Sequence, residues 1–406
     1  MEFNKKILSN GLVIIGEPNE SAKSAAVGFF VKTGSRDETR QVSGASHFLE
    51  HMLFKGTEKL NWSDVNEAFD RTGAQFNAST SEENTVYYAA VLPEYLAEVT
   101  GLWTELMRPA LRKEDFNLEK NVIKQEIAMY KDQPSFDVME RCKNLYFDEH
   151  PCGNSVLGSE ESIDNLTSEQ MRAYFASRYA PNNMVLACAG NFDWEQICTI
   201  AEKSCGKWQR KDVGRTLKPC QDGRKKNSIE KSNLTCEHIC LMSAGVPYQD
   251  PRRFAASVLA TIIGDDVGSR FFWELVDKAI AEAAAMQFGA MDGTGVFQSY
   301  IRCSKENAAK VLDVVEGIFH SLAESGVTED ELKKAKNKIL TALVIKNELP
   351  MGRLVDLGFN WIYLQEYRNI EDDINAIKGV TTDDVNSLIK QFEPGNFAQF
   401  SIGPAG

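Results

Sequence analysis

The sequence has few histidines and no long apolar run. Only five histidines occur among 406 residues, and no stretch of about 18 apolar residues is present that could cross a membrane. The N-terminal residues 1–8 also lack the apolar core of a secretion signal. We therefore expect a soluble cytoplasmic protein without a membrane partner, or a protein of an organelle matrix or the periplasm if a leader has been removed.

Cysteine pairs and basic blocks are absent as well. The nine cysteines are odd in number and form no Cys-x-x-Cys pair, and several lie in apolar runs such as the one around Cys188. This pattern favours buried free thiols and a reducing compartment over a disulfide framework. A net charge of −13, with no block of Lys and Arg among aromatic residues, argues against nucleic acid as a partner.

The length predicts more than one domain, because a single hydrophobic core rarely extends over 406 residues. Residues 206–231 combine many Lys and Arg with glycines and a proline and contain few apolar residues, which is typical of a linker. We therefore expect an N-terminal domain over residues 1–205 and a C-terminal domain over residues 232–406.

The most informative motif is His-x-x-Glu-His, formed by His47, Glu50 and His51. In a helix the two histidines lie one turn apart on the same face, so that both imidazoles can bind one metal ion. Ser43 can cap this helix, and the residues around the motif are mostly apolar, which predicts burial. Glu50 is placed to act as a base beside the metal. The alternative is a structural histidine pair on a core helix.

A second helix, predicted over residues 113–131, offers further carboxylates. Glu119 and Glu126 share a stripe with Val122 and Ile123, while the lysines of this segment take other faces. A solvated face would place the glutamates among the lysines instead. The pattern therefore favours Glu126 as a third metal ligand and Glu119 as a residue that supports a ligand.

After the predicted linker, the order of strands and helices starts again. Both long helices end just before a proline, Pro134 in the first half and Pro350 in the second. Aligning these prolines places Ala342 opposite Glu126, so the second copy keeps the pattern and loses the ligand. The sequence predicts a duplicated domain with one metal site, in the first half.

Several motifs together resemble the pitrilysin family of inverzincin peptidases, and within it the half-length branch that includes mitochondrial processing peptidase and small bacterial homologues. The resemblance covers nearly the whole chain. It implies an α+β fold of two homologous, duplicated α/β-roll domains, each with a largely antiparallel sheet packed with helices. The matching segments are residues 10–12, 34–38, 47–57, 77–80, 119–126, 179–184 and 189–191.

The same resemblance implies the residue roles. Zinc, one ion per chain, would be bound by His47, His51 and Glu126. Glu50 would be the general base, and Glu119 a supporting acid. Residues Asn77 and Ala78 match the family's edge strand, where an extended peptide substrate adds as a further strand. The function implied is a zinc metalloendopeptidase that hydrolyses peptide bonds of unfolded peptides.

The chain departs from the family at one motif of its second half. Val276 and Ala283 occupy the positions of an Arg and a Tyr that bind the substrate backbone and support the oxyanion. We therefore expect the zinc-bearing subunit of a two-subunit peptidase, with low activity alone, whose homologous partner supplies the Arg and Tyr, or else a homodimer. A non-catalytic peptide-binding or assembly subunit is the alternative. A purely structural metal is disfavoured because such sites usually have four protein ligands.

Overall fold

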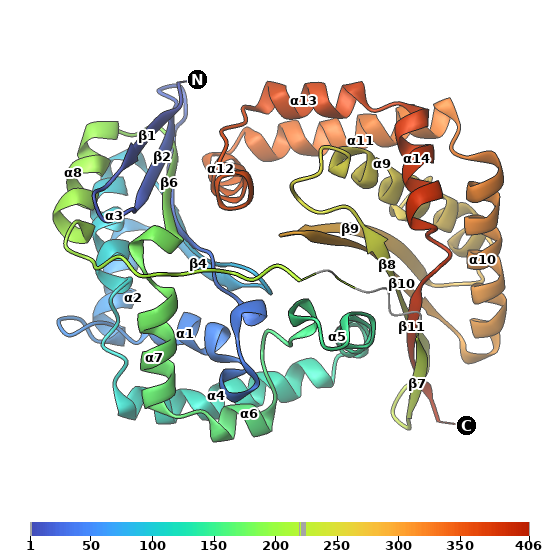
Figure 1. Cartoon of the computed structure of the whole chain (residues 1–406), viewed down its shortest axis with the longest axis horizontal. Helices are drawn as coiled ribbons and strands as arrows, with labels where there is room; N and C mark the ends of the chain where they lie inside the picture. The colour runs from blue at the N-terminus through green and yellow to red at the C-terminus, as the bar shows by residue number, and fades with distance from the viewer. Residues whose placement is uncertain (1, 219, 221–224, 406) are drawn as a thin grey trace. The chain divides into compact units, whose positions relative to one another are not determined.

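The computed structural model describes residues 2–218, 220 and 225–405 of the chain. These residues form two compact units, each built on one sheet with helices packed against it (Figure 1). The α+β class with a sheet in each half is therefore confirmed. None of the described helices combines the length and the apolar content that a membrane span requires.

Unit 1 comprises residues 1–128, 154–216 and 344–368. Its six-stranded sheet has the order β1-β2-β6-β3-β5-β4. The strands are β1 (Asn4–Ile7), β2 (Val13–Pro18), β3 (Ala25–Val31), β4 (Gln75–Thr80), β5 (Thr85–Val91) and β6 (Met184–Gly190). The helices are α1 (Ala45–Phe54), α2 (Trp62–Thr72), α3 (Leu96–Leu106), most of α4 (Lys113–Lys131), α6 (Glu160–Asn165), α7 (Ser168–Arg178), α8 (Trp194–Cys205) and α12 (Pro350–Leu364).

Unit 2 comprises residues 129–153, 217–343 and 369–406. Its five-stranded sheet has the order β7-β11-β8-β10-β9. The strands are β7 (Lys226–Lys231), β8 (Glu237–Gly245), β9 (Ala283–Met291), β10 (Thr294–Cys303) and β11 (Ala398–Pro404). The helices are α5 (Pro134–Phe147), α9 (Arg253–Gly264), α10 (Ala308–Ser325), most of α11 (Glu329–Asn347), α13 (Ile370–Gly379) and α14 (Thr382–Phe392), with a π-helical turn, η6, over Phe272–Val276.

The two sheets have equivalent topology. In unit 1, β2 pairs in parallel with β6, and β3, β5 and β4 follow as antiparallel neighbours. In unit 2, β7 pairs in parallel with β11, and β8, β10 and β9 follow in the same way. The predicted duplication is thus visible as a shared order of five strands, to which unit 1 adds β1 at its edge.

Each compact unit includes one helix from the other half of the sequence. Helix α12 packs on β3 and β6 of the first sheet, and α5 packs on β8 and β11 of the second. In α12, Leu354 and Leu357 join an apolar cluster with Phe30, and the buried Arg353 pairs with Glu17 at 2.8 Å. The unit boundaries therefore differ from the domains expected at residues 1–205 and 232–406.

The expected linker over residues 206–231 also includes regular structure. Its last six residues form β7, which pairs with β11. Positions 219 and 221–224 of this segment lie outside the described residues. The domain limits at residues 1–205 and 232–406 stay a prediction about the units that fold independently.

Candidate metal centre

Helix α1 carries His47, Glu50 and His51, and it is almost fully buried. The helix begins after Gly44, whose φ of +89° favours glycine, and not directly after Ser43 as the sequence suggested. The orphan amides of its first turn are bound by a buried carboxylate, because Glu38 accepts hydrogen bonds from the amides of Gly44 at 2.7 Å and Ser46 at 2.6 Å. This contact fixes the start of the helix directly before His47.

Helix α4 is held against α1 by an aromatic stack. The rings of Phe48 and Phe116 lie 4.8 Å apart, with an interplanar angle of 8°, and both are buried. Ile123 and Ile127 continue the buried face of α4. The apolar face of α4 thereby brings its carboxylates to the histidine pair. The helix has the limits that the sequence predicted, Lys113–Lys131.

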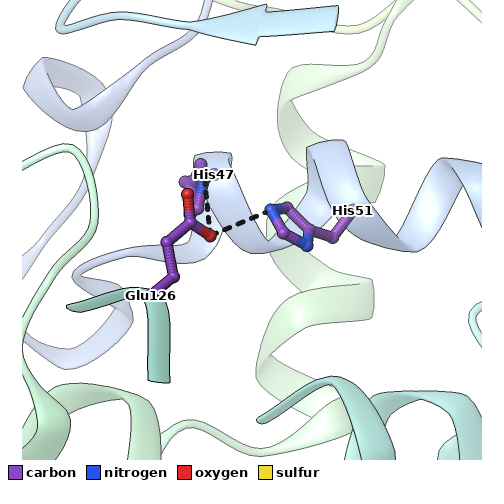
Figure 2. Close-up of side chains that lie close together, drawn as sticks. All are labelled: His47, His51 and Glu126. Atoms are coloured by element: carbon purple, nitrogen blue, oxygen red, sulfur yellow. Dashed lines mark ion pairs between the residues drawn. The ribbon is translucent and has the colours of Figure 1, made fainter. Parts of the chain in front are cut away.

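Three side chains converge between these two helices (Figure 2). Oε2 of Glu126 lies 3.7 Å from Nε2 of His47 and 3.4 Å from Nε2 of His51. One candidate ligand atom from each residue lies within 4.8 Å of the others, and no other such group occurs in the described part of the chain. The structure therefore brings together the three residues that the sequence singled out as metal ligands.

Glu119, which lies two helical turns before Glu126 on α4, supports this group. Its Oε1 lies 2.8 Å from Nδ1 of His51, and its Oε2 pairs with Lys55 at 2.5 Å. A carboxylate on Nδ1 fixes the ring and leaves Nε2 free to bind a metal. The donor set of two imidazole nitrogens and one carboxylate oxygen suits zinc, and it leaves a coordination position for a water or substrate. The residues present therefore fit the implied ion.

The pKa values show how charge is distributed among the candidate ligands. Burial and the neighbouring His51 lower the pKa of His47 to about 4. Burial opposes protonation of His51 as well, but hydrogen bonds with Glu119 and Glu126 outweigh it and raise its pKa to about 9. The hydrogen bond with His51 lowers the pKa of Glu126. A proton on His51 thus satisfies the two carboxylates where a cation would otherwise do so.

Glu50 lies beside the three converging residues and is not one of them. Thr80, the last residue of β4, donates a hydrogen bond from Oγ1 to Oε2 of Glu50 at 2.5 Å. Burial raises the pKa of Glu50, and the hydrogen bonds with Thr80 partly offset this. Burial thus makes this carboxyl group a better proton acceptor than an exposed glutamate, as a general base requires.

The predicted substrate residues Asn77 and Ala78 lie on β4, at the edge of the first sheet. β4 pairs with β5 and packs against α1. The amide of Ala78 donates to the side chain of Asn77 at 2.9 Å. The structure thus places both residues on an edge strand beside the helix that carries Glu50, while their contact with a peptide stays a prediction.

Sequence reasoning missed Glu38, Lys55 and Thr80. Each lies in or next to a motif that was noted, but their contacts with α1 and α4 depend on tertiary packing. The remaining histidines, His150, His238 and His320, lie outside the metal-type group.

Comparison with known proteins shows which family the chain resembles. Residues 13–160 match the sequence profile described as insulinase (peptidase family M16), and residues 165–339 match the profile described as peptidase M16 inactive domain. An uncharacterized zinc protease of Bacillus subtilis is 29% identical over 399 residues, covering 98% of this chain and 97% of the relative. One of Mycobacterium tuberculosis is 30% identical over 410 residues, covering 98% of this chain and 92% of the relative.

Solved structures share the fold over the full chain. A protease from Helicobacter pylori superposes with a TM-score of 0.91 at 21% identity, covering 99% of both chains. A peptidase M16 inactive domain from Pseudomonas fluorescens gives 0.92 at 18% identity, covering 100% of this chain and 98% of the other. The expected resemblance is confirmed, and the expected zinc cofactor is confirmed at the level of the family. With a full-length relative at 30% identity and both profiles matched in order, the chain belongs to peptidase family M16.

Proposed function

We propose that this chain is a zinc metalloendopeptidase that cleaves unfolded peptides. The observation that carries the proposal is the convergence of His47, His51 and Glu126 from two helices, with candidate ligand atoms within 4.8 Å of one another. The relatives named zinc protease support zinc as the ion. Glu119 would orient His51 from behind, through the hydrogen bond on Nδ1.

In the proposed reaction, Glu50 accepts the proton that a water molecule loses as it attacks the peptide carbonyl, and holds it on its carboxyl group for the leaving amine. A bound zinc ion supplies the positive charge that acidifies water and polarises the carbonyl. The partly buried position of Glu50 raises its pKa, which favours the uptake of a proton by this group.

The substrate would bind as an additional strand on β4. Among the described residues, β5 is the one strand that pairs with β4, which leaves the other edge of β4 without a strand partner there. An extended peptide can pair with such an edge through main-chain hydrogen bonds. Asn77 and Ala78 would then lie beside the peptide. This mode requires an extended, unfolded substrate.

Substituting Glu50 tests the assignment. Glu50→Gln should keep zinc bound, because Glu50 is not in the ligand group, and should lower peptide hydrolysis by roughly 10²–10⁴-fold. Zinc content by elemental analysis and cleavage of an internally quenched peptide measure the two effects. Glu67→Gln, the same change at an exposed position of α2, is the matched control. Unchanged hydrolysis in Glu50→Gln would refute the role of Glu50 as the base.

We also propose that the chain acts as the zinc-bearing subunit of a two-subunit enzyme. Val276 ends η6 and packs partly buried on the apolar core of unit 2, and Ala283 begins β9. Neither side chain offers a hydrogen-bond donor to an oxyanion, and the loss of such a donor typically costs about 10²–10³-fold in rate. A homologous subunit that retains the Arg and Tyr would complete the site.

Mixing experiments distinguish these possibilities. The chain alone should bind zinc and cleave peptides slowly, and a homologue that retains the Arg and Tyr should raise the rate by roughly 10²–10³-fold. Full activity of the chain alone would exclude the two-subunit proposal. The absence of Arg and Tyr also favours a second candidate, a peptide-binding subunit without turnover. Zinc and peptide binding with no hydrolysis, with or without a homologue, would identify that function.

A further inference from the structure

Thr80 links the edge strand to the proposed base. It is the last residue of β4 and pairs with Thr85 of β5, so its backbone is fixed by the sheet. Its hydroxyl donates to Oε2 of Glu50 at 2.5 Å, and its backbone amide is a second donor to the same carboxylate. A hydrogen bond from a hydroxyl to a carboxylate of this length belongs to the strong, charge-assisted class.

Glu50 needs such an anchor because its side chain is long and only partly buried. A glutamate on a helix can adopt many rotamers, and fixing them costs conformational entropy. Within the described residues, Thr80 supplies the hydrogen bonds found for this carboxylate. Helix α1 therefore fixes the backbone position of Glu50, and the hydrogen bonds from β4 fix the position of its carboxylate.

We propose that Thr80 is the positioning residue for Glu50. Through the hydrogen bonds of Thr80, the strand expected to bind the substrate also orients the carboxylate of the proposed base. This inference rests on the proposed peptidase function. Asn77 and Ala78, the residues expected to bind the peptide, lie on the same short strand as Thr80. A carboxylate held by that strand keeps a fixed place relative to any peptide added to its edge, so that part of the orientation needed for attack exists before the substrate binds.

The alternative is that the hydroxyl only satisfies a partly buried carboxylate. In that case its removal would lower stability and leave the chemical step unchanged. A positioning role predicts that removal of the hydroxyl slows the chemical step. An interaction that matters in the transition state changes kcat and leaves substrate binding and zinc binding unchanged.

Three variants separate the two roles. Thr80→Val removes the hydroxyl with little change in shape, and Thr80→Ser restores it. Thr199→Val, at an exposed position of α8 whose hydroxyl bonds to the backbone of Glu195, is the matched control. We expect Thr80→Val to retain zinc and its KM while kcat falls roughly tenfold, Thr80→Ser to recover most of kcat, and Thr199→Val to match the parent. Equal kcat in Thr80→Val and the parent, or no recovery in Thr80→Ser, would overturn the proposal.

Crystal structures of the parent chain and Thr80→Val give a reading that does not depend on turnover. The Glu50 carboxylate should be ordered against Thr80 in the parent and displaced or disordered in Thr80→Val, while the ligand side chains stay in place. An unmoved carboxylate would overturn the positioning role even if the chain proves inactive. If the parent and Glu50→Gln show the same lack of hydrolysis, the proposed function fails, and the crystal comparison still decides the role of Thr80.

Discussion

At the scale of single residues, the site consists of ligands and of the groups that hold them. His47, His51 and Glu126 meet in the structure as the sequence predicted, because helix periodicity fixes the first two and the apolar stripe of α4 aims the third. Thr80 could not be predicted in this way, since it reaches Glu50 from β4, 30 residues along the chain. The contact of Glu38 with the start of α1 depends on the conformation of the segment just before the helix, which helix periodicity does not report.

Zinc affinity should depend on pH through His51. In the metal-free chain this residue has a pKa of about 9, so zinc must displace a proton from it at neutral pH. Affinity should fall about tenfold per pH unit below that pKa and level off above it. His47, with a pKa of about 4, is already neutral and adds no such dependence. Calorimetry near pH 7 in buffers of different ionisation enthalpy should find about one proton released per zinc, and no release would contradict this prediction.

Glu119→Gln should weaken zinc binding without abolishing it. The substitution removes the charge that orients His51 and pairs with Lys55, and the loss of such a supporting carboxylate typically costs about 10–100-fold in metal affinity. Competition with a chromophoric chelator measures the change. Glu114→Gln, exposed in the first turn of the same helix, should bind zinc like the parent chain. Equal affinities of the two variants would remove Glu119 from the site.

At the scale of elements, the sequence predicted the helices better than their partners. The limits of α4 and the prolines that begin α5 and α12 follow from local pattern. The sheets on which α5 and α12 pack do not follow from local pattern. An apolar face indicates that a helix is buried, but it does not indicate which strands the helix packs against. Similarly, β7 is short and polar and gains its order by pairing with β11.

The buried pair of Arg353 and Glu17 should be the main polar anchor of α12. Their side chains are 5% and 1% exposed, and Tyr367 donates a further hydrogen bond to Glu17 at 2.8 Å. Arg353→Met should destabilise the chain by about 3–5 kcal/mol, because it leaves a buried carboxylate unpaired. Adding Glu17→Leu should recover much of this loss. Urea denaturation measures both, with Lys6→Met at the exposed pair Lys6–Glu202 as the control that leaves the midpoint unchanged. Similar midpoints for the single and double variants would contradict the anchor.

At the scale of the whole chain, the same sheet topology occurs in both units, and among the described residues the candidate metal ligands come together in unit 1 alone. The sheets share their strand order, but α9 contains no His or Glu where α1 carries both, and Ala342 lies in α11 where α4 has Glu126. The match of residues 165–339 to the profile of an inactive domain agrees with this division. Purified chain should therefore bind one zinc ion, and native mass spectrometry that found two tightly bound ions would contradict the assignment of a single site.

The most direct test of the central claim is anomalous diffraction from a crystal of the zinc-loaded chain, recorded on both sides of the zinc absorption edge. We expect one peak, bounded by Nε2 of His47, Nε2 of His51 and the carboxylate of Glu126. A map without a peak at this point, or with its zinc peak among other side chains, would contradict it.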